Sequence, residues 1–402
     1  MNDRIVLLAF FSFLLSVAIA KPLFIETSTF RSPVLPLKPG LVANKYFFDA
    51  GFKKGHVAVK QVFAEVVTES GKSVPLTEAY IHHWTLFRYF QKQGTNVSLA
   101  NFAAATANGD FLLSAKNLSC HGDDLAFGSG SETRRTDYDL PDPYGYETGN
   151  PEKKPMGYDE KWLLNIHVID TRGVVDSLGC LECRCDLYNV TSKSDGKPLP
   201  VGYKGGMSCC PDQQRCRLLD GVPDVTRKLY LKYVVHWTMW NKNVLPAKVY
   251  GFDVTVPKTD AMNPKESCQG SVEYQINPCG KETTSRECVY HNSTRIISQA
   301  DGYVILVFAH QHVGGIGSAL YAQNGRLICV SRPIYGRGRR PGNEKGYVVG
   351  MTTCRPKLGT VKVAKNEILG LESNYSSAAL HTGVMGLFGV VVAAELPDGR
   401  RY

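Results

Sequence analysis

The stretch YVILVFAHQHV, residues 303–313, is almost entirely apolar until His310. Its valines, isoleucine and aromatic residues favour a β-strand, in which alternate side chains share a face. His310 and His312 then project to the same side as Leu306 and Phe308. Two imidazoles in apolar surroundings cannot both be charged cheaply, whereas neutral imidazole is a good metal ligand. The stretch predicts a strand that ends in half of a metal site, or else two partly exposed histidines at a strand end.

The rest of the chain repeats this strand-like composition between clusters of glycine, proline and asparagine, and it lacks long helical periodicity. Further strands are expected at 56–67, 161–170, 227–240, 248–256 and 385–395, and the polar stretch 128–160 predicts a long loop. The pattern predicts an all-β fold of two jelly-roll-like β-sandwich domains. We expect them at residues 21–222 and 223–402, with a cysteine-rich insert at 180–216 inside the first.

Several features predict export from the cell. Residues 1–20 have a basic start, an apolar run and small residues at Ala18 and Ala20, as in a signal peptide. The chain has twelve cysteines, and its five N-glycosylation sequons lie at Asn96, Asn117, Asn189, Asn292 and Asn374. The apolar run 383–394 is too short for a membrane span of ~20 residues. A secreted, extracellular glycoprotein with no membrane span is therefore expected.

The net charge and the insert each allow two interpretations. The charge of +9 keeps the protein soluble or favours contact with an acidic cell-wall polymer, and no nucleic-acid signature accompanies it. The CLEC spacing within the insert at 180–216 also suits zinc. Outside the cell, disulfides are the expected state of these cysteines, although their pairing cannot be derived from spacing.

A second group of candidate ligands lies in the first half. His82 and His83 are adjacent, so both reach one ion only if their strand bends. His167 lies in the middle of the strand expected at 161–170. Met385, at the start of an apolar strand, is either a soft ligand that favours Cu(I) or a core residue.

These segments together resemble the type II copper, ascorbate-dependent monooxygenases, the group that contains peptide-amidating and dopamine-hydroxylating enzymes. YIHHWTLF (80–87) resembles that family's histidine-pair segment, and KWLLNIHVID (161–170) resembles the strand with its third histidine. FAHQHVGG (308–315) resembles its His-x-His hairpin. The closing stretch from GMTTC (350–354) to HTGVMGLFGVVV (381–392) is similar to the segment with its ligand methionine. Over nearly its full length, the chain resembles the plant stress up-regulated, nodulin-like (Nod-nineteen) family, which implies the apoplast or cell wall as its location.

The copper resemblance implies two copper ions, one per domain, with ascorbate as the reductant. The ligands of the first ion would be His82, His83 and His167. His310, His312 and Met385 would hold the second ion, where an unidentified small molecule or modified residue is hydroxylated. Met351 is the fallback for the methionine.

The chain also departs from the copper family's pattern. Phe308 and Gly389 occupy the positions where the amidating enzymes hold a peptide carboxylate, so peptide amidation is not expected. Trp84 replaces a methionine after the histidine pair. Two alternatives stay open: a non-catalytic, stress-related scaffold that binds a cell-wall component or partner, and a zinc hydrolase that uses the three-histidine set. His381 is expected at an exposed strand end, with a role as an extra ligand or as a hydrogen-bond donor behind the ligands as the alternative. The arginines of the loop 335–346 are expected to be exposed to solvent, or else to hold an anionic substrate or ascorbate.

Overall fold

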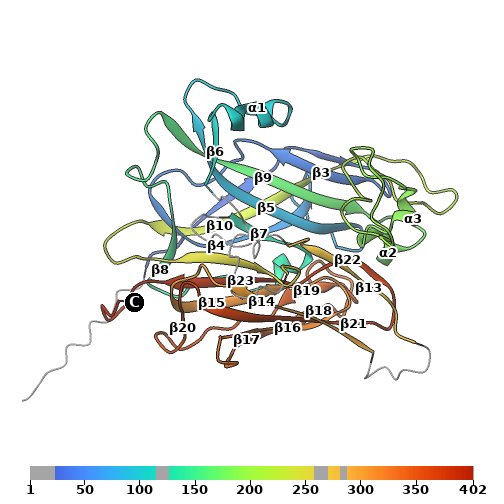
Figure 1. Ribbon diagram of the computed structural model, residues 1–402. Coiled ribbons are helices and arrows are strands. Elements are labelled where there is room, and N and C mark those ends of the chain that lie inside the picture. The colour runs from blue at the N-terminus through green and yellow to red at the C-terminus, as the bar shows by residue number, and fades with distance from the viewer. Residues whose placement is uncertain (1–22, 115–125, 258–269, 281–287, 402) are drawn as a thin grey trace, which may run out of the picture.

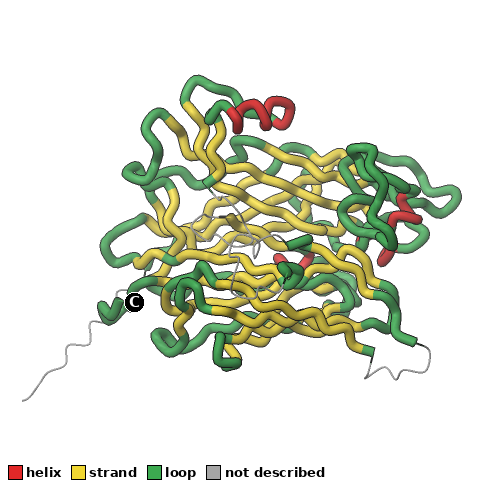
Figure 2. The backbone as a smooth tube through the Cα atoms, in the orientation of Figure 1, coloured by secondary structure: helices red, strands yellow, loops and turns green. Residues whose placement is uncertain are grey.

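The computed structural model describes residues 23–114, 126–257, 270–280 and 288–401. The expected signal peptide, Cys120, Cys268 and the sequon at Asn117 lie outside these ranges. Within them the chain forms 23 β-strands and only short helices, so the all-β prediction is confirmed (Figure 2). In the described part of the chain, no helix is long and apolar enough to cross a membrane.

The first half of the chain forms two sheets. One has the strand order β1 (Glu26–Arg31), β10 (Arg227–Met239), β4 (Val57–Thr68), β8 (Tyr144–Thr148), β11 (Leu245–Pro246), and β2 (Leu35–Leu37) also pairs with β10. The other has the order β3 (Val42–Phe47), β9 (Tyr158–Asp170), β5 (Ala79–Lys92), β6 (Phe111–Leu113), and β7 (Ala126–Ser129) also pairs with β5. Short helical segments lie at η1 (Leu99–Asn101), α1 (Phe102–Ala107) and η2 (Ser131–Arg134).

The second half forms two four-stranded sheets and two strand pairs. The four-stranded sheets are β12 (Lys248–Asp253), β23 (Leu387–Ala393), β15 (Gly302–His310), β20 (Lys362–Val363), and β14 (Val289–Ile297), β21 (Ile368–Ser376), β16 (Gly315–Tyr321), β17 (Leu327–Ser331). The pairs are β13 (Glu273–Ile276) with β22 (His381–Met385), and β18 (Pro333–Tyr335) with β19 (Val348–Met351). Figure 1 shows the sheets of the two halves stacked on each other.

Strand β15 lies between two hydrophobic cores, which explains its almost continuous apolar sequence. Leu306 packs into the core of the first half and Phe308 packs against it, while Val307 and Ala309 belong to the core of the second half. This is the predicted alternation. Ile305 was expected beside Val307, but it packs with Leu306 because the pairing register shifts between Val304 and Leu306.

The division into domains at residue 222 stays a prediction, but β10 bears on it. This strand follows the expected boundary and pairs with β1, β2 and β4 of the first half. Its apolar residues Leu229, Leu231 and Tyr233 are buried in the core of that half. The expected boundary therefore separates β10 from the sheet to which it belongs.

The insert at 180–216 forms a separate small core at one end of the first half. It contains the end of α2 (Ser177–Leu181) and α3 (Cys185–Tyr188), and its core also includes Val42 of β3 and Ile169 of β9. Its disulfides are Cys180–Cys216, Cys183–Cys210 and Cys185–Cys209, and two more lie in the second half, Cys279–Cys288 and Cys329–Cys354. The expectation of disulfides in the insert is confirmed.

Candidate metal centre

A bulge in β5 brings the adjacent histidines to one side. Ile81 pairs with Val168 of β9 and His83 with His167, so His82 is an extra residue in the ladder. One ring nitrogen from each of His82, His83 and His167 lies within 4.8 Å of the others. The bend that two neighbouring histidines require is therefore present, and the three residues form a set with metal-ligand spacing.

The second pair of histidines lies directly beside this set. His310 is the last residue of β15, and its Nε2 lies 3.1 Å from Nε2 of His312. The His312 ring is 4.9 Å from the His82 ring, centroid to centroid. The two ligand sets expected in separate domains thus meet between the halves. We call His82, His83, His167, His310 and His312 the five-histidine cluster.

Most of the cluster is shielded from water. His82, His167 and His312 are at most 1% exposed. Burial lowers the pKa of all three rings well below the ordinary value, and it lowers the pKa of His83 to about 4. These imidazoles are therefore neutral at pH 7, which is the state that binds metal ions.

Several nitrogens of the cluster have no hydrogen-bond partner among the residues that the structure describes. Both ring nitrogens of His82, Nδ1 of His167 and Nδ1 of His312 are buried and unpaired. Buried polar atoms are nearly always paired, because an unsatisfied one costs ~1–3 kcal/mol. A group of neutral imidazoles with open nitrogens fits a transition-metal ion, whose coordination would replace the missing hydrogen bonds.

Other side chains orient the rings from outside the cluster. Glu132, on η2, accepts a hydrogen bond from Nδ1 of His310 at 2.6 Å, and Asn165 of β9 lies 2.8 Å from Nε2 of His83. Cys210 Sγ lies 3.6 Å from Nε2 of His167, so the Cys183–Cys210 disulfide packs against the cluster. Because the Glu132 carboxylate accepts the Nδ1–H of His310, the lone pair of this ring is on Nε2, where it can bind a metal ion.

We expect Glu132→Gln to weaken copper binding by about 10- to 100-fold, the usual effect of losing such a carboxylate–histidine contact. The variant keeps the shape of the side chain and removes its charge. Affinity is measured by competition with a chromogenic copper chelator. Glu182→Gln is the matched control, because Glu182 bonds Nδ1 of His381 at the same 2.6 Å outside the cluster. Equal losses in both variants would contradict the role given to Glu132.

The two candidate methionines have different surroundings. Met385 lines a cavity together with His83 and His310. Its backbone carbonyl accepts the hydroxyl of Tyr375, which in turn accepts the backbone N–H of His312 at 2.8 Å. Met351 belongs to the hydrophobic core of the second half. Of the two residues, only Met385 is among those that line the cavity.

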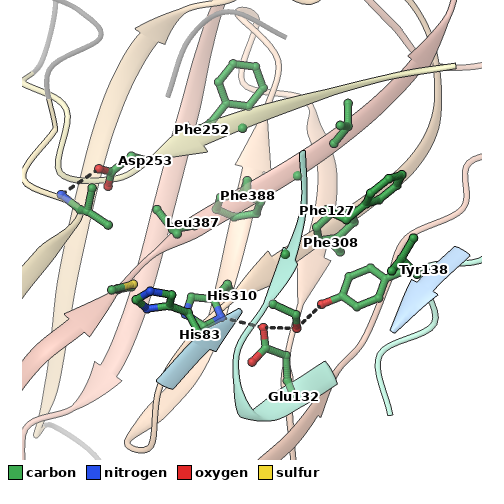
Figure 3. Close-up of a pocket in the computed structure, with 18 of the residues that line it drawn as sticks. His83, Phe127, Glu132, Tyr138, Phe252, Asp253, Phe308, His310, Leu387 and Phe388 are labelled. Carbon is green, nitrogen blue, oxygen red and sulfur yellow. Dashed lines mark hydrogen bonds and ion pairs between the residues drawn. The ribbon is translucent and has the colours of Figure 1, made fainter. Parts of the chain in front are cut away.

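This cavity, of about 390 Å³, lies between the halves and reaches the five-histidine cluster. Phe308 of β15 pairs with Gly389 of β23, and its ring occupies the space above this glycine. A Cβ on Gly389 would lie 2.2 Å from Cζ of Phe308. Figure 3 shows His83, His310 and Glu132 at one side of the cavity. The residues that line it are Gln61, Val62, His83, Phe127, Gly128, Ser129, Glu132, Tyr138, Tyr146, Met207, Val249, Gly251, Phe252, Asp253, Val272, Phe308, His310, Met385, Leu387, Phe388 and Gly389.

The remaining candidates lie outside the cluster. The expectation of an exposed His381 is wrong: the residue is only 5% exposed, because Glu182 of the insert binds its Nδ1. Arg337, Arg339 and Arg340 are exposed, as expected of a solvated loop.

The comparisons with solved structures give only weak similarities. The VP2 subviral particle of infectious bursal disease virus is 10% identical, with a TM-score of 0.19, over 93% of this chain and 73% of the viral chain. T=1 particles derived from the same virus are 11% identical, with a TM-score of 0.17, over 93% and 70%. Scores this low support no conclusion about fold or function. No curated protein matches the chain.

The family model gives a match over almost the whole chain. The model described as stress up-regulated Nod 19 matches residues 24–395, which include every member of the five-histidine cluster and Met385. The chain belongs to the stress up-regulated Nod 19 family.

Proposed function

We propose that the protein is a secreted copper protein that oxidises a substrate beside the five-histidine cluster, with ascorbate or a similar reductant. The observation that carries the proposal is the convergence of five imidazoles from both halves of the chain, three of them almost fully buried and several with unpaired nitrogens. The five disulfides of the described residues support an oxidising, extracellular location.

The chemistry of the donors favours copper over harder cations. Imidazole nitrogens bind Cu(II) and Zn(II) well, whereas a thioether such as that of Met385 favours Cu(I). The carboxylate nearest the cluster, Glu132, already holds His310. Bound copper would supply the one-electron chemistry that dioxygen activation needs.

The residues of the chain would hold and shield this chemistry. The histidines supply the nitrogen ligands, Glu132 fixes the ring of His310, and the apolar wall of the cavity limits the access of water. The Phe308 ring, which fills the space above Gly389, leaves no place for a carboxylate anchor there. A substrate with a free C-terminal carboxylate is therefore not favoured.

The direct test is elemental analysis of protein purified from a eukaryotic secretion host. We expect about two copper ions per chain, as three-ligand sets for each of two ions would give. Copper-loaded protein should consume dioxygen only when ascorbate is present. Zinc-loaded protein is the control and should be inactive. A protein that retains no copper against dialysis would refute the proposal.

One observation favours a second candidate, a non-catalytic secreted protein that keeps the metal for stability and binds a cell-wall component or partner. His82, His167 and His312 are almost fully buried, as in closed structural metal sites rather than open catalytic ones. This candidate predicts bound copper, a higher melting temperature than the metal-free protein, and no ascorbate-dependent oxygen consumption.

A further inference from the structure

We propose that the cavity beside the five-histidine cluster binds an uncharged aromatic molecule. The inference deepens the proposed function and rests on it in one respect, that the ligand of this cavity is the substrate. The lining of the cavity, its size and the charges around it support this assignment.

The wall of the cavity is made largely of aromatic rings. Phe127, Tyr138, Phe252, Phe308 and Phe388 all line it, and Figure 3 shows these rings around the same space. Tyr138 and Phe308 meet edge to face, with ring centroids 4.8 Å apart. Aromatic rings pack favourably in such edge-to-face and offset arrangements, so a ligand ring would extend the existing contacts.

The size of the cavity sets an upper limit on the ligand. A volume of about 390 Å³ falls at the lower end of the range for small-molecule sites, ~300–1,000 Å³. Such a space holds a molecule with one or two rings. It does not hold a folded segment of a partner protein.

The charges at the cavity argue against both anions and cations. Among the described residues that line it, the only charged side chains are Glu132 and Asp253, and none is lysine or arginine. In the metal-free protein, an anion would therefore meet negative charge with no compensating lysine or arginine, at the cost of its own hydration.

A cation finds no accessible counter-ion, because both carboxylates are buried, Glu132 at 1% and Asp253 at 2% exposure. Glu132 Oε1 accepts hydrogen bonds from the His310 ring and from Ser129, whereas its Oε2 is buried and has no partner among the described residues. Asp253 is 2% exposed and accepts hydrogen bonds from Thr255 and from the backbone of Val272. A neutral ligand avoids both penalties.

The test uses 6-propionyl-2-(dimethylamino)naphthalene, an uncharged fluorescent probe with two rings, and three competitors of one shape. 2-Phenylethanol is neutral, 2-phenylethylamine is cationic and phenylacetate is anionic at pH 7. We expect 2-phenylethanol to displace the probe at about tenfold lower concentration than either charged competitor, since desolvation of an unpaired charge costs more than 1.4 kcal/mol. Equal or stronger displacement by a charged competitor would overturn the proposal.

A pair of variants locates the binding site. Leu387 lines the cavity, so Leu387→Trp should fill it and weaken probe binding by about tenfold, as overfilling of a packed space does. Leu327→Trp, on the outer strand β17 at 49% exposure, is the matched control and should bind the probe normally. Unchanged binding in Leu387→Trp that melts like the wild type would place the probe elsewhere and overturn the assignment.

The titration is run on metal-free and on copper-loaded protein, so that the two proposals fail separately. Neutral-selective binding by a protein that never retains copper would refute the proposed function and keep the cavity assignment. A copper-loaded protein that consumes oxygen with ascorbate, but does not bind the probe, would refute the cavity assignment alone.

Discussion

His82→Ala is expected to lower the copper affinity of the whole five-histidine cluster, by ~100-fold or more, since even the loss of an outer contact costs 10- to 100-fold. The reason is the central position of this ring. Its centroid lies 4.6 Å from that of His167, 5.6 Å from that of His83 and 4.9 Å from that of His312. Removal of His82 therefore takes a donor from the junction of both ligand sets. Copper content after dialysis against a competing chelator measures the effect.

The variant should still fold, because neither ring nitrogen of His82 makes a hydrogen bond that would be lost. His56→Ala is the control. His56 is paired with Glu147 and stacks on Trp240, and it does not belong to the cluster. Loss of one copper ion, with the other bound at wild-type affinity, would show that the two ligand sets bind independently. His82→Ala protein that keeps the wild-type copper content and affinity would show that His82 is not a ligand.

The sequence predicted the strands of this site better than their relation to one another. Alternation along residues 306–309 placed these four side chains on the faces that the structure gives them, whereas Ile305 lies on the other face because of the register shift. The bulge at His82 was recognisable only as a requirement, since strict alternation sends His82 and His83 to opposite faces. That His82 and His312 meet depends on how the halves pack, which no local pattern encodes.

Glu132 could not be found from the sequence. It lies in the polar stretch 128–160, which predicts a long loop, and its neighbours are threonine and arginines. In the structure this stretch is not one long loop: it contains the short helix η2 (Ser131–Arg134) and strand β8 (Tyr144–Thr148), and Ser131, Glu132 and Thr133 are buried. Polar residues are tolerated in this position because partners from the second half, such as the backbone of Val348 and the ring of His310, satisfy them. Such partners are separated by more than 170 positions in sequence.

The same reason explains the error at His381 and the unexpected pairing of β10. His381 follows a serine- and alanine-rich turn, which favours an exposed position, yet Glu182 binds it from 199 positions away. Strand β10 follows the cysteine-rich insert, where a composition change suggests a boundary, yet it pairs with β1 and β4. Composition reports on neighbours in sequence, whereas sheet membership is decided by long-range pairing.

Glu344→Ala is expected to lower the free energy of unfolding by ~3–5 kcal/mol, the usual cost of removing one partner of a buried ion pair. The Glu344 side chain is fully buried in the second half. Its Oε1 accepts hydrogen bonds from Nη1 of Arg134 at 3.1 Å and from the backbone N–H of Leu76 at 2.9 Å, both in the first half. Without Glu344, the guanidinium keeps only the longer contact with Glu65, at 3.5 Å, and the carbonyl of Val74.

Urea denaturation measures this change, and two further variants separate its causes. Glu344→Gln keeps an acceptor for Leu76 but removes the charge, so a loss close to that of Glu344→Ala would assign the cost to the unpaired guanidinium of Arg134. Asp398→Ala removes a partner of Arg400 at the surface and should leave the denaturation midpoint unchanged. A Glu344→Ala midpoint equal to that of Asp398→Ala would mean that water reaches Arg134 between the halves. The two halves would then be held together by their shared apolar core, through residues such as Leu306, and not by this ion pair.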